Sequence, residues 1–228
     1  MKAIVAILAL GSALLAQTPA PTKSAAPAAK SVAALLNPAS LKAKAPDVFN
    51  VKFATSAGDI VIEVHRAWAP LGADRFYNLA KNDFFDNASF YRVVPGFMAQ
   101  FGIPADPRVA KAWQNASFPD DRVLQSNGPG YITFANTGDP NSRGTQVFIN
   151  TGNNSFLDSK LFAPFGKVTE GMDVVRKLYG GYGEATTSRQ PLIEAQGKAY
   201  LDKNYPKLDF IKSTTVTVAE APAAPAKK

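Results

Sequence analysis

The sequence predicts one mainly β domain, either a barrel or a sandwich whose ends are covered by helices. Short runs rich in β-branched and aromatic residues recur between turn-forming residues, whereas helical periodicity is confined to three segments. Every Phe, Tyr and Trp lies within residues 46–218, a length that suits one domain. There is no internal repeat of fixed period, which argues against a solenoid or propeller.

The expected elements follow one another with short connections. Strands at 50–55 and 59–65 flank the small-residue turn 56–58 and form a hairpin. Residues 103–130 are rich in Pro, Asp, Asn and Gly, which predicts a long ordered loop where function often resides. Further strands are expected at 84–101, 131–136, 146–150, 165–168 and 213–218, and helices at 70–82, 170–179 and 191–204.

The first 20 residues are typical of a secretory signal peptide. Lys2 precedes the apolar run Ala3–Ala16, which is short for a membrane span and ends in small residues. We therefore expect cleavage after Ala16 or Ala20 and a periplasmic or secreted product that is not stably inserted in a membrane. An uncleaved N-terminal anchor is the alternative.

Low-complexity segments flank the predicted domain on both sides. Residues 21–45 consist mostly of Ala, Pro, Lys and Ser and predict a semi-extended linker, and residues 219–228 predict a disordered tail. The net charge of +7 comes from outside residues 46–220: seven of the 25 basic residues lie there, one of them Lys2, which leaves 18 basic against 18 acidic residues inside. A neutral domain argues against a nucleic-acid partner.

Several classes of chemistry are disfavoured by what the chain lacks. Without cysteine there is no disulfide, thiol nucleophile or thiolate metal site, and the single histidine, His65, has no evident second ligand. The chain has no nucleophile-elbow motif, and its glycine-rich pieces lack the lysine of a phosphate loop. We therefore expect neither a metal site nor a cofactor.

One arginine stands out in the apolar segment 90–102, FYRVVPGFMAQFG. Side chains alternate along a strand, so Met98 and Gln100 share a face, and a tight bend at Pro95-Gly96 allows Arg92 to join them. Likewise Gln146 and Phe148 share a face in a later strand. An ordinary strand arginine with its head in water is the simpler interpretation of Arg92 alone. Together these side chains predict a surface that binds polypeptide around one fixed cation.

Three motifs in the same order resemble the cyclophilin family of peptidyl-prolyl isomerases. They are FYRVVPGFMAQFG, then FANTGDPNSRGTQVFIN, then FLDSKLFAPFGKV, and the resemblance extends over about 50–179. It implies a closed eight-stranded antiparallel β-barrel capped by two helices, with a peptide groove on the outer wall.

The resemblance also implies roles for particular residues. Arg92 corresponds to the catalytic arginine, and Gln100 to the glutamine that orients it. The remaining correspondences are a proline pocket of Phe97, Met98, Phe148 and Leu157, and a peptide-binding strip of Ala135, Asn136, Thr137, Gln146 and Phe156.

Three hypotheses follow from these residues. The first is a monomeric, exported isomerase that accelerates rotation of X-Pro bonds in proline-containing polypeptides and assists their folding. The second is a non-catalytic module or chaperone of the same fold that only binds such segments. The third is a structural cell-surface domain, which an uncleaved signal sequence would favour.

Overall fold

Alternation of buried and exposed side chains shapes the first hairpin of the computed structural model, which describes residues 32–218. Strand β1, Val48–Thr55, and strand β2, Asp59–His65, each bury every second residue and pair in antiparallel register from Val48–His65 to Ala54–Asp59. Such alternation is expected where one face of a sheet meets the core and the other meets water. The hairpin predicted for this region is confirmed.

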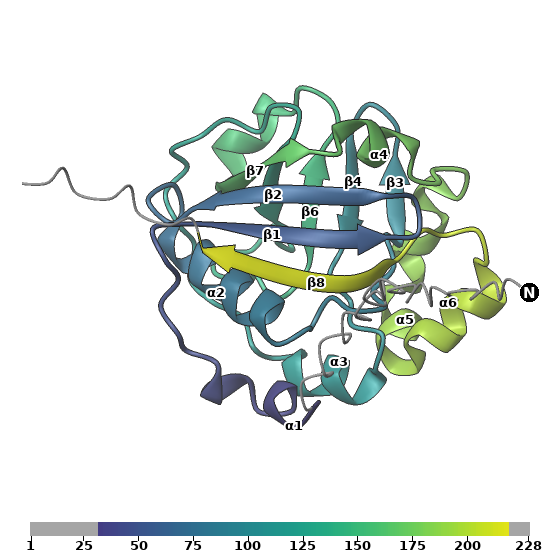
Figure 1. The fold of residues 1–228 in the computed structure, drawn as a ribbon. Coiled ribbons are helices and arrows are strands. Elements are labelled where there is room, and N and C mark those ends of the chain that lie inside the picture. Colours follow the sequence, from purple (N-terminus) through teal and green to yellow (C-terminus); the bar gives the residue numbers. More distant parts are fainter. Residues whose placement is uncertain (1–31, 219–228) are drawn as a thin grey trace, which may run out of the picture.

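Eight strands form a single antiparallel sheet with the order β3-β4-β6-β5-β7-β2-β1-β8. The sheet curls, so that β1, β2 and β8 lie in front of β4 and β6 in Figure 1. The other strands are β3 Arg92–Val94, β4 Met98–Phe101, β5 Tyr131–Phe134, β6 Val147–Asn150, β7 Pro164–Glu170 and β8 Ile211–Val218.

The sheet remains open, which corrects the predicted closed barrel. Its two edge strands, β3 and β8, share no ladder. Backbone hydrogen bonds around the isolated bridge Ser89–Phe210 join only the segment before β3 to the start of β8, from Asn87 to Ile211, from Ile211 to Ala88 and from Phe90 to Asp209. The cause is local: β3 has only three residues, and the chain that leads into it is mostly turn. The mainly β class and the eight antiparallel strands are confirmed.

Aromatic rings fill the inside of the curl. Helix α2, Pro70–Lys81, places Phe76 against Phe53 and Phe165, with ring centroids 6.2 and 4.9 Å apart. These three rings are fully buried, and buried aromatic pairs with such geometry add to the stabilisation given by apolar burial. Helix α4, Met172–Lys177, lies at the opposite side of the sheet from α2 (Figure 1).

Three predicted segments are subdivided in the structure. The strand expected at 84–101 becomes β3 and β4, joined by a turn at Pro95-Gly96, and the loop expected at 103–130 contains helix α3, Pro107–Trp113. The helix expected at 191–204 is two helices, α5 Gln190–Gln196 and α6 Lys198–Asn204. Gly197 separates them because its φ of +63° is not helical; glycine adopts this conformation readily, whereas an L side chain rarely does.

The predicted linker overlaps the described residues from Val32 onward, and there it packs on the domain. Helix α1, Val32–Leu35, and the 3₁₀ turn η1, Pro38–Ser40, precede a segment in which Ala43 exchanges hydrogen bonds with the side chain of Asn78. The indole of Trp113 also donates to the carbonyl of Leu35, 2.8 Å. The signal peptide and the tail predicted at 1–20 and 219–228 lie outside the described residues. Within 32–218, no helix has the length and apolar character needed to span a membrane.

Candidate active site

A tight turn brings Arg92 and Gln100 opposite each other. The amide of Phe97 donates to the carbonyl of Val94, 3.0 Å, and Gly96 adopts φ +75°, as a Pro-Gly turn of type II requires. In the resulting register Arg92 pairs with Gln100. Directly opposed residues project from the same face, so the shared face predicted from strand parity is confirmed.

The guanidinium of Arg92 is held from two sides. Its Nη1 donates to Oε1 of Gln100 at 3.0 Å, while its Nε and Nη2 donate to the two carboxylate oxygens of Glu184 at 2.8 and 2.6 Å. These contacts use three of the five N–H groups of the side chain. One N–H on Nη1 and one on Nη2 therefore remain for a ligand, counting contacts among residues 32–218.

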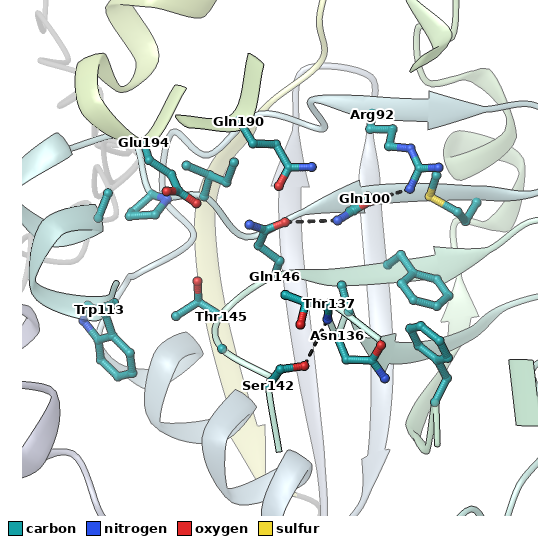
Figure 2. A pocket seen from close by; sticks show the side chains of 18 of the residues that line it. Arg92, Gln100, Trp113, Asn136, Thr137, Ser142, Thr145, Gln146, Gln190 and Glu194 are labelled. Atoms are coloured by element: carbon teal, nitrogen blue, oxygen red, sulfur yellow. Dashed lines mark hydrogen bonds between the residues drawn. The ribbon is translucent and has the colours of Figure 1, made fainter. Parts of the chain in front are cut away.

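The hydrogen-bond network continues beyond Gln100. The side-chain amide of Gln100 donates to Oε1 of Gln146 at 3.0 Å, and the hydroxyl of Tyr91 donates to the same oxygen. Burial raises the pKa of the Tyr91 phenol, so this group stays a neutral donor. Figure 2 shows Arg92, Gln100 and Gln146 in a row, which fixes the direction in which the guanidinium points.

Glu184 reaches Arg92 from the 3₁₀ segment η3, Gly183–Arg189. This segment is pinned to the strand region because Thr186, which is fully buried, donates its hydroxyl to the carbonyl of Tyr91 at 2.5 Å. The Thr187 hydroxyl donates to Glu184 at 2.6 Å. The hydrogen bonds from Arg92 hold the pKa of the Glu184 carboxyl below its ordinary value, against a smaller opposing effect of burial.

Removing Glu184 should weaken the site without destroying it. We expect Glu184→Ala to lower kcat/KM for an X-Pro peptide about three- to tenfold, since the guanidinium loses its fixed orientation. The exposed Glu170, changed to Ala, is the matched control and should leave the rate unchanged. A higher rate in Glu184→Ala would show instead that the carboxylate withholds Arg92 from the substrate.

An apolar pocket lies beside this polar row. Met98, Phe148 and Leu157 form a buried cluster against which Phe97, Ala135 and Phe162 pack. The rings of Phe148 and Phe162 meet edge to face with centroids 5.8 Å apart. An apolar pocket of this kind, with three Phe rings among these six side chains, suits a compact apolar group such as a proline ring.

Ten of the eleven predicted site residues line one cavity of about 470 Å³: Arg92, Phe97, Met98, Gln100, Ala135, Asn136, Thr137, Gln146, Phe148 and Leu157. The exception, Phe156, is 55% exposed and stacks outside the cavity on Phe97, with ring centroids 6.2 Å apart. The structure thus brings the predicted residues together, while their individual roles stay predictions.

The cavity extends further than the sequence indicated. Its far end is formed by Trp113 and Gln114 near the end of α3 and by Gln190 and Glu194 of α5 (Figure 2). Neither helix was expected to contribute, and no motif in the sequence pointed to Glu184 or Glu194. A signal for α3 did exist, because Asp106-Pro107 is a helix start and the Asp106 side chain accepts from the amide of Arg108 at 2.8 Å.

Among the described residues no cluster of three His, Asp or Glu side chains is placed to hold a metal ion. His65 bonds Glu63 at 2.7 Å and stacks on Trp68, away from the cavity residues. The site therefore offers one arginine, amide donors and acceptors, and an apolar pocket.

The model for the family described as cyclophilin type peptidyl-prolyl cis-trans isomerase/CLD matches residues 50–196. The chain belongs to this family. The cyclophilin-type relatives include the peptidyl-prolyl cis-trans isomerase cypE of Dictyostelium discoideum, 37% identical over 131 residues that cover 56% of this chain and 83% of that protein. A peptidyl-prolyl cis-trans isomerase of Acinetobacter baylyi is 36% identical over 132 residues, covering 56% and 70%.

Solved cyclophilin structures share the fold. A cyclophilin type isomerase of Cryptosporidium parvum superposes with a TM-score of 0.55 at 18% identity, covering 75% of this chain and 99% of that one. The same isomerase in the presence of the dipeptide ala-pro gives 0.54 at 19% identity with the same coverage. The cyclophilin fold expected from the sequence motifs is thereby confirmed, with the open sheet described above.

Proposed function

We propose that this protein is a peptidyl-prolyl cis-trans isomerase that accelerates X-Pro bond rotation in exported polypeptides and so assists their folding. The observation that carries the proposal is the position of Arg92, which keeps two N–H groups for a ligand and lines the same cavity as the apolar pocket of Met98, Phe148 and Leu157. A proline ring in that pocket places its peptide bond beside a fixed cation.

The chemistry requires no nucleophile and no proton shuttle. Rotation about a peptide bond faces a barrier of ~18–20 kcal/mol because the C–N bond has partial double-bond character. Before proline the two isomers are close in energy, yet they exchange over tens to hundreds of seconds. A catalyst needs only to favour the twisted state over both planar ones.

Arg92 supplies that preference in the proposed mechanism. In the twisted state the prolyl nitrogen regains its lone pair, and a donor aimed at it is favoured only then. A charge-assisted hydrogen bond contributes about 1.5–3 kcal/mol, which corresponds to roughly 10- to 150-fold in rate. The apolar pocket lowers the barrier further, because it holds the proline ring and excludes water.

A non-catalytic binding module or chaperone is the second candidate. One observation favours it: Glu184 pairs with Arg92 at 2.6 and 2.8 Å, which partly neutralises the cation that catalysis needs. In that case the cavity would hold proline-containing segments without accelerating their rotation.

Exchange NMR of a short Ala-Pro peptide separates the two candidates. The isomerase should broaden and merge the cis and trans signals when it is present in catalytic amounts. If the peptide signals shift on binding but the isomers exchange no faster, the result supports the non-catalytic binding module. If the peptide neither binds nor exchanges faster, both candidate functions are contradicted.

Export is proposed from the composition of residues 1–20. We further propose that the mature protein acts in the periplasm or outside the cell, as a monomer and without nucleic acid. N-terminal sequencing of the protein purified from its natural host should begin after Ala16 or Ala20. Recovery of a chain that still carries Met1 in a membrane fraction would support the uncleaved anchor instead.

A further inference from the structure

We propose that the far end of the cavity, at Glu194, binds a basic side chain of the substrate polypeptide and so makes the enzyme prefer X-Pro sites that have a nearby Lys or Arg. This inference rests on the proposed function. It adds a specificity-determining residue, Glu194, that lies apart from the arginine and the apolar pocket.

Glu194 and Arg92 line the same continuous cavity. In Figure 2 Glu194 lies on the opposite side of Gln146 from Arg92, and Gln190 and Thr145 are among the labelled side chains around it. A peptide whose proline occupies the apolar pocket can therefore extend along the cavity from Arg92 to Glu194. The volume of about 470 Å³ leaves room for a second side chain beside the proline ring.

The Glu194 carboxylate has no partner among the described residues. It makes no hydrogen bond and no ion pair there, in contrast to Glu184. Burial raises the pKa of Glu194, and no neighbouring cation opposes this effect. A half-buried carboxylate that has no hydrogen-bond donor or cation beside it loses part of its solvation free energy. A cation that enters the cavity can form a charge-assisted hydrogen bond with Glu194 and so offset this loss.

Three basic side chains on the neighbouring helices have partners other than Glu194. On α3, Arg108 pairs with Asp106 at 2.6 Å and Lys111 donates to Gln114 at 3.2 Å. On α6, Lys198 pairs with Asp202 at 2.5 Å. The chain thus neutralises its other carboxylates around this end of the cavity and leaves Glu194 available.

The walls beside Glu194 suit a long basic side chain. Ile103, Pro104, Ala110 and Trp113 line the cavity with apolar surface, against which the methylene stem of Lys or Arg can pack. Gln190 and Thr145 add neutral polar groups near the charged end. An acidic side chain at the same place meets like charge and is disfavoured.

The test compares peptides that differ only in charge. Each carries one proline, with Lys, norleucine or Glu placed in turn one, two or three residues before or after it. The kcat/KM by exchange NMR and the Kd by titration are measured for every peptide. For the wild-type protein, Lys at one of these positions should raise kcat/KM about five- to tenfold over norleucine, and Glu should lower it.

Two variants assign the preference to Glu194. Glu194→Gln should bring the Lys-to-norleucine ratio of kcat/KM to about one. Glu194→Lys should reverse the order and favour the Glu peptide. The exposed Glu170, changed to Gln, is the matched control and should keep the wild-type preference.

The outcomes separate the inference from the function on which it rests. Equal kcat/KM and Kd for the Lys and norleucine peptides at every position, or a preference that survives Glu194→Gln, would overturn the role of Glu194 even if all peptides are isomerised. If no peptide is isomerised, the proposed activity fails, and the Kd values still decide whether Glu194 selects a basic side chain.

Discussion

Arg92→Ala is expected to slow isomerisation of an Ala-Pro peptide by about two orders of magnitude, because the substitution removes the charge-assisted hydrogen bond that only the twisted state receives. Affinity for the peptide should fall much less, since the apolar pocket of Met98, Phe148 and Leu157 stays in place. Exchange NMR gives the rate, and titration of the same peptide gives the Kd.

Controls for Arg92→Ala separate chemistry from folding. The Arg92–Glu184 pair joins a side chain that is 22% exposed to one that is 56% exposed, and pairs of this kind contribute at most about 1 kcal/mol to stability. The melting temperature should therefore change by only a few degrees. The exposed Arg176, changed to Ala, should keep the full rate. A loss in Arg92→Ala of less than about threefold would exclude the role assigned to Arg92.

Asp121→Ala is expected to cost about 3–5 kcal/mol of the free energy of unfolding, because it leaves a buried guanidinium without its main partner. The Arg143 side chain is 1% exposed, and its Nη1 and Nη2 both donate to Oδ2 of Asp121 at 3.1 Å. The same carboxylate accepts from the amides of Leu71 and Gly72 at 3.0 and 2.8 Å, so it also caps the start of α2.

Urea unfolding of the wild type and of two variants measures this cost. The control is Asp173→Ala, which breaks a solvent-exposed pair with Lys177 and should leave the free energy of unfolding nearly unchanged. Asp120 lies 3.4 Å from Arg143 and stays in place in both variants. A loss of less than about 1 kcal/mol in Asp121→Ala would show that Asp120 alone compensates the buried charge.

Strand patterns predicted the central part of the site well. Parity along two short strands placed Arg92 with Gln100, and Gln146 with Phe148, because an apolar, alternating strand leaves little freedom of register when one face is buried. The register Arg92–Gln100 and the shared cavity bear this out. Family motifs then supplied the other predicted site residues, all of which line the cavity except Phe156.

The contributions from the helical segments were beyond the sequence patterns. Glu184 lies in a 3₁₀ turn and Glu194 on a seven-residue helix, and such short elements carry too few turns for a periodic signal. Their places depend on long-range contacts, such as that of Thr186 with Tyr91, 95 residues apart. The open edge was likewise unpredictable, because it depends on how few residues of β3 pair.

The position of β8 has a consequence for how fast the protein folds. Strand β1 gains its second partner only from β8, through pairs such as Phe49–Val218, which join the first strand of the sheet to the last. The entropy lost on closing so long a loop grows only slowly with its length, so the effect on stability is small. The stabilising contacts between β1 and β8, however, can form only after this loop has closed, which slows folding. We therefore expect refolding on the millisecond-to-second scale of non-local β topologies, limited by the meeting of the first and last strands.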